Sequence, residues 1–204
     1  MTAAARATHT DVTGLILAGG LGRRMSADGR GTNKALQLFR GRPMLAHVLE
    51  RLHPQVTNVL INANDCIAEF ECFTCPIISD RFAGYQGPLA GLHAGLVSCA
   101  TGWLITAPCD SPFLPLDLVS RLMHAQQQHS AQIAVASCDG QLHPVFALVA
   151  TNLQSSLEAF LATGQRKIDR WFDTQKTVVA EFDNASAFLN VNTMADLRRY
   201  EGDL

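Results

Sequence analysis

The chain has 204 residues, of which 48% are hydrophobic and 17% charged, and a formal net charge of −2. This balance is typical of one globular domain that buries about 70% of the surface of its unfolded chain. No run approaches ~18 apolar residues and no basic cluster exceeds Arg23 and Arg24, so we expect neither a membrane span nor an extended nucleic-acid surface.

Residues 1–11 are small and polar and lack an apolar core, which predicts a disordered tail before a single domain over 12–204. Thr13–Ala18 is the first predicted strand, and it ends at a glycine-rich turn over 19–22. Glycines allow backbone N–H groups to approach a ligand closely, and the two arginines that follow match phosphate oxygens. We therefore expect a polyphosphate site; the alternative is a turn with two solvated arginines.

Two better-known glycine motifs are excluded at this turn. No Gly-x-x-x-x-Gly-Lys-[Ser/Thr] string occurs, so the turn is not a P-loop. The dinucleotide fingerprint fails as well, because Gly20-Leu-Gly22-Arg-Arg is followed by Met25 instead of Gly or Ala.

Polar side chains follow the next two predicted strands. The predicted elements in this part of the chain are a helix over Pro43–Leu52 and strands over Asn58–Asn62 and Cys75–Ser79. Asn62 and Asn64 carry amides that can read a base or ribose edge, and Asp80 opens a glycine-rich loop. Isolated asparagines are more often turn formers, and a surface aspartate is the alternative for Asp80.

A helix over Leu89–Cys99, rich in small residues for close packing, precedes a strand over Trp103–Ala107. Asp110 follows that strand between two prolines, which stiffen the loop and fix the direction of the carboxylate. A rigid carboxylate opposite a phosphate site suits Mg²⁺, which one or two carboxylates and substrate phosphates usually hold. The alternative is that Asp110 caps a helix that begins near Pro115.

The pattern changes in the rest of the chain. The predicted elements are Pro115–His129, Leu153–Ala162 and Thr193–Tyr200 as helices and Ile133–Ser137, Pro144–Ala150 and Thr177–Glu181 as strands. The loop between the first two of these strands contains Asp139-Gly140, a turn pair, but is longer than a tight hairpin. His143 is expected to be structural, and Asn192 or Thr193 can cap the last helix.

Alternating strands and helices predict a mostly parallel, Rossmann-like α/β sheet with helices on both faces. Ligands of such sheets bind beyond the carboxyl ends of the strands. The glycine turn, Asn62–Asn64, Asp80 and Asp110 each follow a predicted strand, so one composite site is expected. The cysteines have no regular spacing, and Cys72-Phe-Thr-Cys75 has no second pair, so we expect free thiols in a cytoplasmic protein.

Several motifs occur together in one order: Leu-Ala-Gly-Gly-x-x-Arg-Arg-Met, Lys34, Gly-Pro-Leu-Ala-Gly, Pro-Cys-Asp-Ser-Pro, His143-Pro144 and Asn-Val-Asn-Thr. With these motifs, the chain from about residue 12 onward resembles the molybdenum cofactor guanylyltransferases of the MobA type. The glycine motif alone is shared by many nucleotidyltransferases, whereas its combination with Gly-Pro-Leu-Ala-Gly and Asn-Val-Asn-Thr is far more specific.

The resemblance implies a nucleotide-diphospho-sugar-transferase-like fold and, with Mg²⁺, transfer of GMP from GTP to the terminal phosphate of molybdenum-molybdopterin. The GTP contacts that it implies are Leu17, Ala18, Gly19, Lys34, Asn62, Asp80 and Asp110. It also implies catalytic roles for Arg24, Lys34 and Asp110, with Mg²⁺ bound by Asp110. Asn190 and Asn192 are implied to contact the pterin. We expect a monomer that makes transient contacts with cofactor donor or acceptor proteins. We expect no binding to nucleic acid or membrane.

The chain departs from the family in two places. The segment between Met25 and Lys34 is longer than the usual stretch, and Asn33 stands where the family often has Asp. A pterin phosphate is ionised at neutral pH, so the transfer needs charge neutralisation rather than a strong general base. Two other functions stay open: transfer of CMP or UMP to a pterin or an alcohol phosphate, and GTP binding without turnover.

Overall fold

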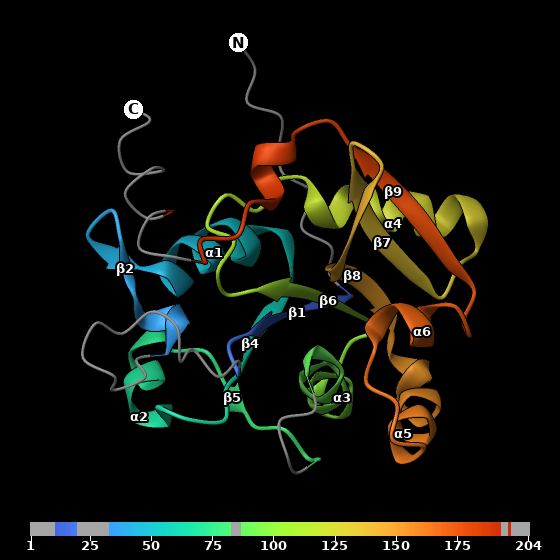
Figure 1. The fold of residues 1–204 in the computed structure, drawn as a ribbon, viewed down its shortest axis with the longest axis horizontal. Helices are drawn as coiled ribbons and strands as arrows, with labels where there is room; N and C mark the ends of the chain where they lie inside the picture. The colour runs from blue at the N-terminus through green and yellow to red at the C-terminus, as the bar shows by residue number, and fades with distance from the viewer. Residues whose placement is uncertain (1–10, 20–32, 83–86, 193–195, 197–204) are drawn as a thin grey trace.

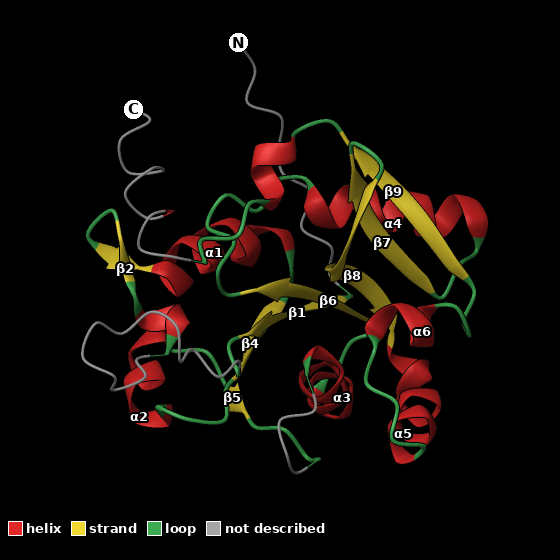
Figure 2. Cartoon of the chain, viewed as in Figure 1, coloured by secondary structure: helices red, strands yellow, loops and turns green. Residues whose placement is uncertain are grey.

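The computed structural model describes residues 11–19, 33–82, 87–192 and 196. Within them lies a seven-stranded sheet in the order β5-β4-β1-β6-β8-β7-β9 (Figure 2). The strands in that order are Ile77–Ile78, Asn58–Asn62, Val12–Leu17, Trp103–Pro108, Gln141–Ala150, Ile133–Cys138 and Thr177–Phe182. The first four are parallel, β8 is antiparallel to both neighbours, and β7 and β9 are parallel. The predicted, mostly parallel sheet is confirmed.

Helices cover both faces of the sheet, with α1 and α4 on one face and α3, α5 and α6 on the other (Figure 1). Their bounds are Met44–Leu52 for α1, Ile67–Phe70 for α2, Pro88–Ser98 for α3, Leu118–His129 for α4, Gln154–Ala162 for α5 and Ile168–Phe172 for α6. Side chains alternate across each strand, so Ile16 of β1 packs in the core under α1 and α4, and Leu15 packs in the core under α3. Both faces are therefore buried.

Short elements complete the described part of the chain. The β2–β3 hairpin joins Leu38–Phe39 to Arg42–Pro43. The 3₁₀ turns are η1 at Lys34–Leu36, η2 at His53–Gln55, η3 at Glu71–Phe73, η4 at Thr151–Leu153 and η5 at Ala185–Phe188. No helix in the described ranges is long and apolar enough to cross a membrane.

The predicted helix over Pro115–His129 begins later, at Leu118. A backbone turn comes first, because the Leu118 N–H donates to the Pro115 carbonyl at 3.3 Å. Gln55, far away in the chain, fixes this start: its amide donates to the Pro115 carbonyl at 2.9 Å and accepts from the Val119 N–H at 3.0 Å. The side chain of Gln55 thus satisfies a backbone N–H at the start of the helix.

The prediction of a long loop between the strands Ile133–Ser137 and Pro144–Ala150, which correspond to β7 and β8, is wrong. Strand β8 begins at Gln141, so Asp139 and Gly140 alone form the turn, with φ of 51° and 74°. Positive φ at both positions is the geometry that a two-residue hairpin turn favours. The register shifts between Val135 and Ala136, opposite the part of β8 that contains Pro144. A proline has no N–H to donate and is tolerated at such an irregularity.

The ends of the chain test two other expectations only in part. Residues 1–10 of the expected tail lie outside the described residues. The predicted helix Thr193–Tyr200 lies outside them too, except for Asp196, whose Oδ2 accepts from the Asn192 N–H at 3.0 Å.

Candidate active site

The carboxyl ends of four parallel strands lie level at one edge of the sheet. Leu17 of β1 pairs with Asn62 of β4 and Pro108 of β6, and Asn62 pairs with Ile78 of β5. The residues that follow these ends are Ala18, Gly19, Ala63, Asn64, Asp80, Cys109 and Asp110. The structure therefore brings the predicted positions after β1, β4, β5 and β6 to one edge of the sheet, as expected for a composite site.

Asn62, Asn64 and Asp80 form a connected group that we call the amide cluster. Asn62 Nδ2 donates to Asp80 Oδ1 and Asn64 Nδ2 donates to Asp80 Oδ2, both at 2.9 Å. The Asp80 N–H donates back to Asn64 Oδ1 at 2.9 Å. Because both amide N–H groups point to one carboxylate, the amide oxygens have fixed directions.

Two glycines let the backbone approach the amide cluster. A Cβ on Gly19 would lie 2.7 Å from Asn64 Nδ2, and a Cβ on Gly91 of α3 would lie 2.4 Å from Asn62 Oδ1. Real Cβ atoms do not come so close, so both positions require glycine for this packing. The motif Gly-Pro-Leu-Ala-Gly thus has a local explanation: its last glycine seats α3 against the side chain of Asn62.

Lys34, Asp110 and Asn192 form a second group, which we call the lysine cluster. Lys34 Nζ contacts both Asp110 Oδ2 and Asn192 Oδ1. The side chains of Lys34 and Asp110 are 17% and 15% exposed, so the ion pair is largely screened from solvent. Residues far apart in the chain thus meet at one point.

The side chain of Asn33 holds Lys34 in place. Its Oδ1 accepts from the Ala35 N–H at 3.0 Å and caps η1. Its Nδ2 donates to the Ala18 carbonyl at 3.0 Å and to Asp65 Oδ1 at 2.8 Å. The turn that carries Lys34 is thereby bonded to the backbone that follows β1.

The loop after β6 is bonded to the segment that contains both late asparagines. The Val191 N–H donates to the Asp110 carbonyl at 2.8 Å, and Ser111 Oγ donates to Asn190 Oδ1 at 2.6 Å. The alternative role of Asp110 as a helix cap is wrong, because Asp117 precedes α4. Asn190 and Asn192 therefore lie beside Asp110.

Asp110 also carries an unsatisfied acceptor. Its Oδ1 is buried, and no hydrogen-bond partner for it exists in the structure as described. A buried carboxylate oxygen of this kind is suited to a cation. No group of three His, Cys, Asp or Glu side chains that could hold a metal occurs in the described ranges. A divalent cation at this carboxylate would therefore take its other ligands from substrate phosphates and water.

Arg24 and the glycines at 20 and 22 lie outside the described residues. The cysteines in the described part of the chain are free, in agreement with the expected thiols. Burial and the neighbouring Asp110 charge raise the pKa of Cys109 to about 12, so its thiol stays protonated. Cys109 is thus not a nucleophile, although it adjoins the lysine cluster.

Two histidines have structural surroundings. His143 of β8 stacks on Phe188 of η5, with ring centroids 4.5 Å apart, and burial lowers its pKa. That contact supports the turn that leads into Asn190. His93 of α3 is buried edge-on against Phe82, neither ring nitrogen has a hydrogen-bond partner where the structure is described, and burial lowers its pKa. The sequence did not single out His93. The one feature that could have indicated it is its polar side chain among the small and apolar residues of α3.

The fold and the polar edge of the sheet together define an α/β nucleotidyltransferase of the nucleotide-diphospho-sugar transferase fold. Residues 14–178 match the model of the MobA-like NTP transferase domain, and the chain belongs to this family.

Named relatives extend over nearly the whole chain. Molybdenum cofactor guanylyltransferases from Cupriavidus pinatubonensis and Cupriavidus metallidurans are 47% and 48% identical. The alignments cover 94% and 96% of this chain and 96% and 97% of the relatives. The solved structure of molybdopterin-guanine dinucleotide biosynthesis protein A from Archaeoglobus fulgidus is 25% identical and superposes with a TM-score of 0.75, covering 93% of this chain and 96% of that one.

Proposed function

We propose that the protein transfers GMP from GTP to the terminal phosphate of molybdenum-molybdopterin, forming molybdopterin guanine dinucleotide and releasing pyrophosphate. The names of relatives that are 47% and 48% identical support the reaction. The observation in this chain that carries it is the lysine cluster, in which Lys34 meets Asp110 beside a buried, unpartnered carboxylate oxygen. A cation and a phosphate chain would complete such a site.

We assign GTP binding to the edge of the sheet between the two clusters. The backbone of Leu17, Ala18 and Gly19 offers close approach, and Asn62 Oδ1 lies beside Gly19 as an acceptor for guanine N–H groups. Asp80 orients that amide by accepting from Asn62 Nδ2 at 2.9 Å. Guanine is distinguished from adenine by its N1–H and exocyclic amine, which need acceptors of this type.

We assign the phosphates to Lys34 and Arg24, whose positive charges would neutralise the α-phosphate and the leaving pyrophosphate. Asp110 would hold Mg²⁺, which would supply further positive charge at the phosphates. Asn190 and Asn192, which lie beside Asp110, are the residues that we assign to the pterin side.

The transfer requires no nucleophilic side chain from the protein. The terminal phosphate oxygen of the pterin forms the new bond to the α-phosphorus of GTP, the bond from that phosphorus to the bridging oxygen breaks, and pyrophosphate leaves. The nucleophile is already ionised at neutral pH, so the residues of the site act by binding, orientation and charge neutralisation. We further propose that 12–204 acts as a single domain in a cytoplasmic monomer.

Thermal shift with four nucleotides tests the nucleotide assignment. With Mg²⁺ present, GTP is expected to raise the unfolding temperature, and CTP, UTP and ATP at equal concentration are not, because only the bound nucleotide stabilises the folded state. A shift with CTP instead would favour a related cytidylyltransferase. Release of pyrophosphate from GTP in the presence of the pterin would then exclude a module that binds GTP without turnover.

A Gly91→Ala substitution is expected to weaken GTP binding about two- to tenfold, because the new Cβ displaces Asn62 Oδ1 and a buried hydrogen bond is worth ~0.5–1.5 kcal/mol. Gly95→Ala, one turn along α3, is the matched control, since its Cβ would lie 2.5 Å from Leu15 Cδ2 and not near the site. Both variants should lose stability, by about 1–3 kcal/mol for overpacking. Calorimetric titration with GTP should separate them; equal affinities would remove Asn62 from the nucleotide site.

A further inference from the structure

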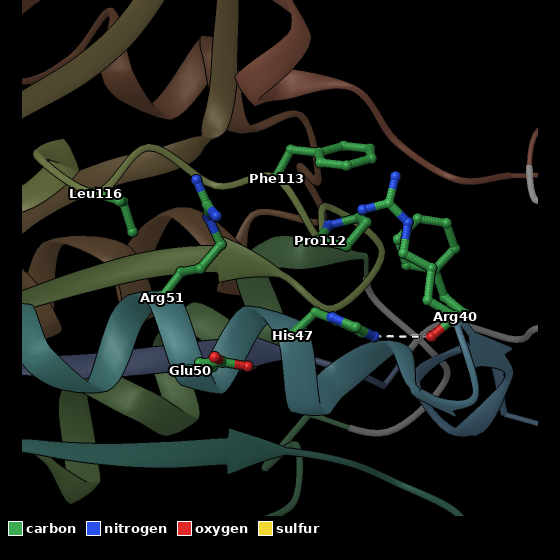
Figure 3. Close-up of a pocket in the computed structure, with 8 residues that line it drawn as sticks. Arg40, His47, Glu50, Arg51, Pro112, Phe113 and Leu116 are labelled. Carbon is green, nitrogen blue, oxygen red and sulfur yellow. Dashed lines mark hydrogen bonds between the residues drawn. The ribbon is translucent and has the colours of Figure 1, made fainter. Parts of the chain in front are cut away.

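A cavity of about 340 Å³ lies between α1, the turn of the β2–β3 hairpin and the loop that follows Asp110 (Figure 3). Its walls include Arg40 from the hairpin turn, Arg51 from α1 and Phe113 from the loop. None of the residues assigned to GTP, Mg²⁺ or the pterin lines it. Its volume is at the lower end of the ~300–1,000 Å³ typical of small-molecule sites.

The charged residues in the described lining of this cavity favour an anion. Arg40 and Arg51 both line it, and Figure 3 shows them on opposite sides of it. The acidic residue in the lining, Glu50, forms an ion pair with Arg42 at 2.8 Å, which lowers the pKa of Glu50 and counters its charge. Two guanidiniums across one cavity match the planar oxygens of a carboxylate or a phosphate.

The remaining walls favour a flat apolar body. The rings of Phe39 and Phe113 meet edge to face, with centroids 5.7 Å apart. The Arg40 guanidinium carbon lies 5.1 Å from the centroid of Phe39 and 5.9 Å from that of Phe113. Leu116, which is 42% exposed, adds an apolar side chain to the lining. Phe39 is only 1% exposed, so the ring of Phe113 and the Arg40 guanidinium are the surfaces against which another ring can pack.

We propose that this cavity is a second ligand site, which binds a small molecule with an aromatic ring and an anionic head group. The ligand would lie against the loop that carries Asp110. That loop is bonded to the wall of the cavity, because Arg51 Nε donates to the Leu114 carbonyl at 2.6 Å. Phe113 packs against the cluster of Phe39, Met44 and Val191, and the Val191 N–H donates to the Asp110 carbonyl.

Calorimetric titration of the full chain with phenyl phosphate, benzoate and inorganic phosphate tests the site. At least one of the two aromatic anions is expected to bind, and the one that binds identifies the head group. Inorganic phosphate is expected to bind at least about tenfold more weakly, because it lacks the ring. Arg40→Gln should lower the affinity for the aromatic anion about tenfold, because it removes one charged donor. Arg170→Gln is the matched control, since Arg170 is an exposed arginine on α6 and is absent from the cavity lining.

A third variant distinguishes this cavity from the phosphate site. Lys34→Gln should leave the affinity for the aromatic anion unchanged, and Arg40→Gln should leave pyrophosphate release from GTP unchanged. The proposal is overturned if neither aromatic anion binds below about 10 mM, or if Arg40→Gln binds as the parent does. It is also overturned if Lys34→Gln loses the binding, or if inorganic phosphate binds as tightly as the aromatic anions. None of these results bears on guanylyl transfer.

Discussion

An Asp110→Asn variant is expected to fold and to turn over GTP on the order of 1000-fold more slowly than the parent. The substitution keeps the size of the side chain but removes the charge that pairs with Lys34 and that would hold Mg²⁺. Loss of about 4 kcal/mol of transition-state stabilisation corresponds to that factor. The initial rate of pyrophosphate release measures the effect, and the unfolding temperature shows whether the variant is folded.

Asp139→Asn is the control for Asp110→Asn. Asp139 is exposed at the β7–β8 turn with a φ of 51°, a conformation that asparagine adopts readily, so its substitution should leave both rate and stability near those of the parent. Raising the Mg²⁺ concentration should rescue Asp110→Asn only weakly, because the position of the ion as well as its occupancy is lost. A folded Asp110→Asn variant that works within about threefold of the parent would remove Asp110 from the metal assignment.

The order of the elements along the chain could be predicted because most of its determinants are local. Asn58–Asn62 was predicted to the residue, since an apolar run between polar ends specifies a buried strand. The composite edge could also be predicted, because parallel strands of one sheet end at the same side. Asp80 and Asp110 needed no contact information to be placed there.

What could not be predicted depends on contacts between distant residues. The start of α4 at Leu118 is set by the side chain of Gln55, and nothing near Pro115 in the sequence indicates it. The position of Lys34 depends on a hydrogen bond from Asn33 to the carbonyl of Ala18, which lies 15 residues earlier in the chain. The family motif implies that Lys34 binds phosphate, but the contact between its ammonium and Asp110 can be found only in the folded chain.

A Lys34→Gln variant is expected to lose roughly 100- to 1000-fold in turnover, the effect of removing one preorganised donor from developing charge. GTP affinity should fall as well, because Lys34 is assigned to the phosphates. Lys176→Gln is the matched control, as Lys176 is exposed at the start of β9, at the opposite edge of the sheet from β5. It should keep the parental rate.

The double variant Lys34→Gln/Asp110→Asn tests whether the two side chains act as one unit. Because Lys34 Nζ contacts Asp110 Oδ2, the interaction is already lost in either single variant. The double variant should therefore turn over GTP only a few-fold more slowly than the slower single variant, far from the product of the two losses. Rates that multiply would mean that the two residues act independently, and their ion pair would then have no part in the reaction. Pyrophosphate release by all four proteins, measured at saturating GTP and Mg²⁺, decides between these outcomes.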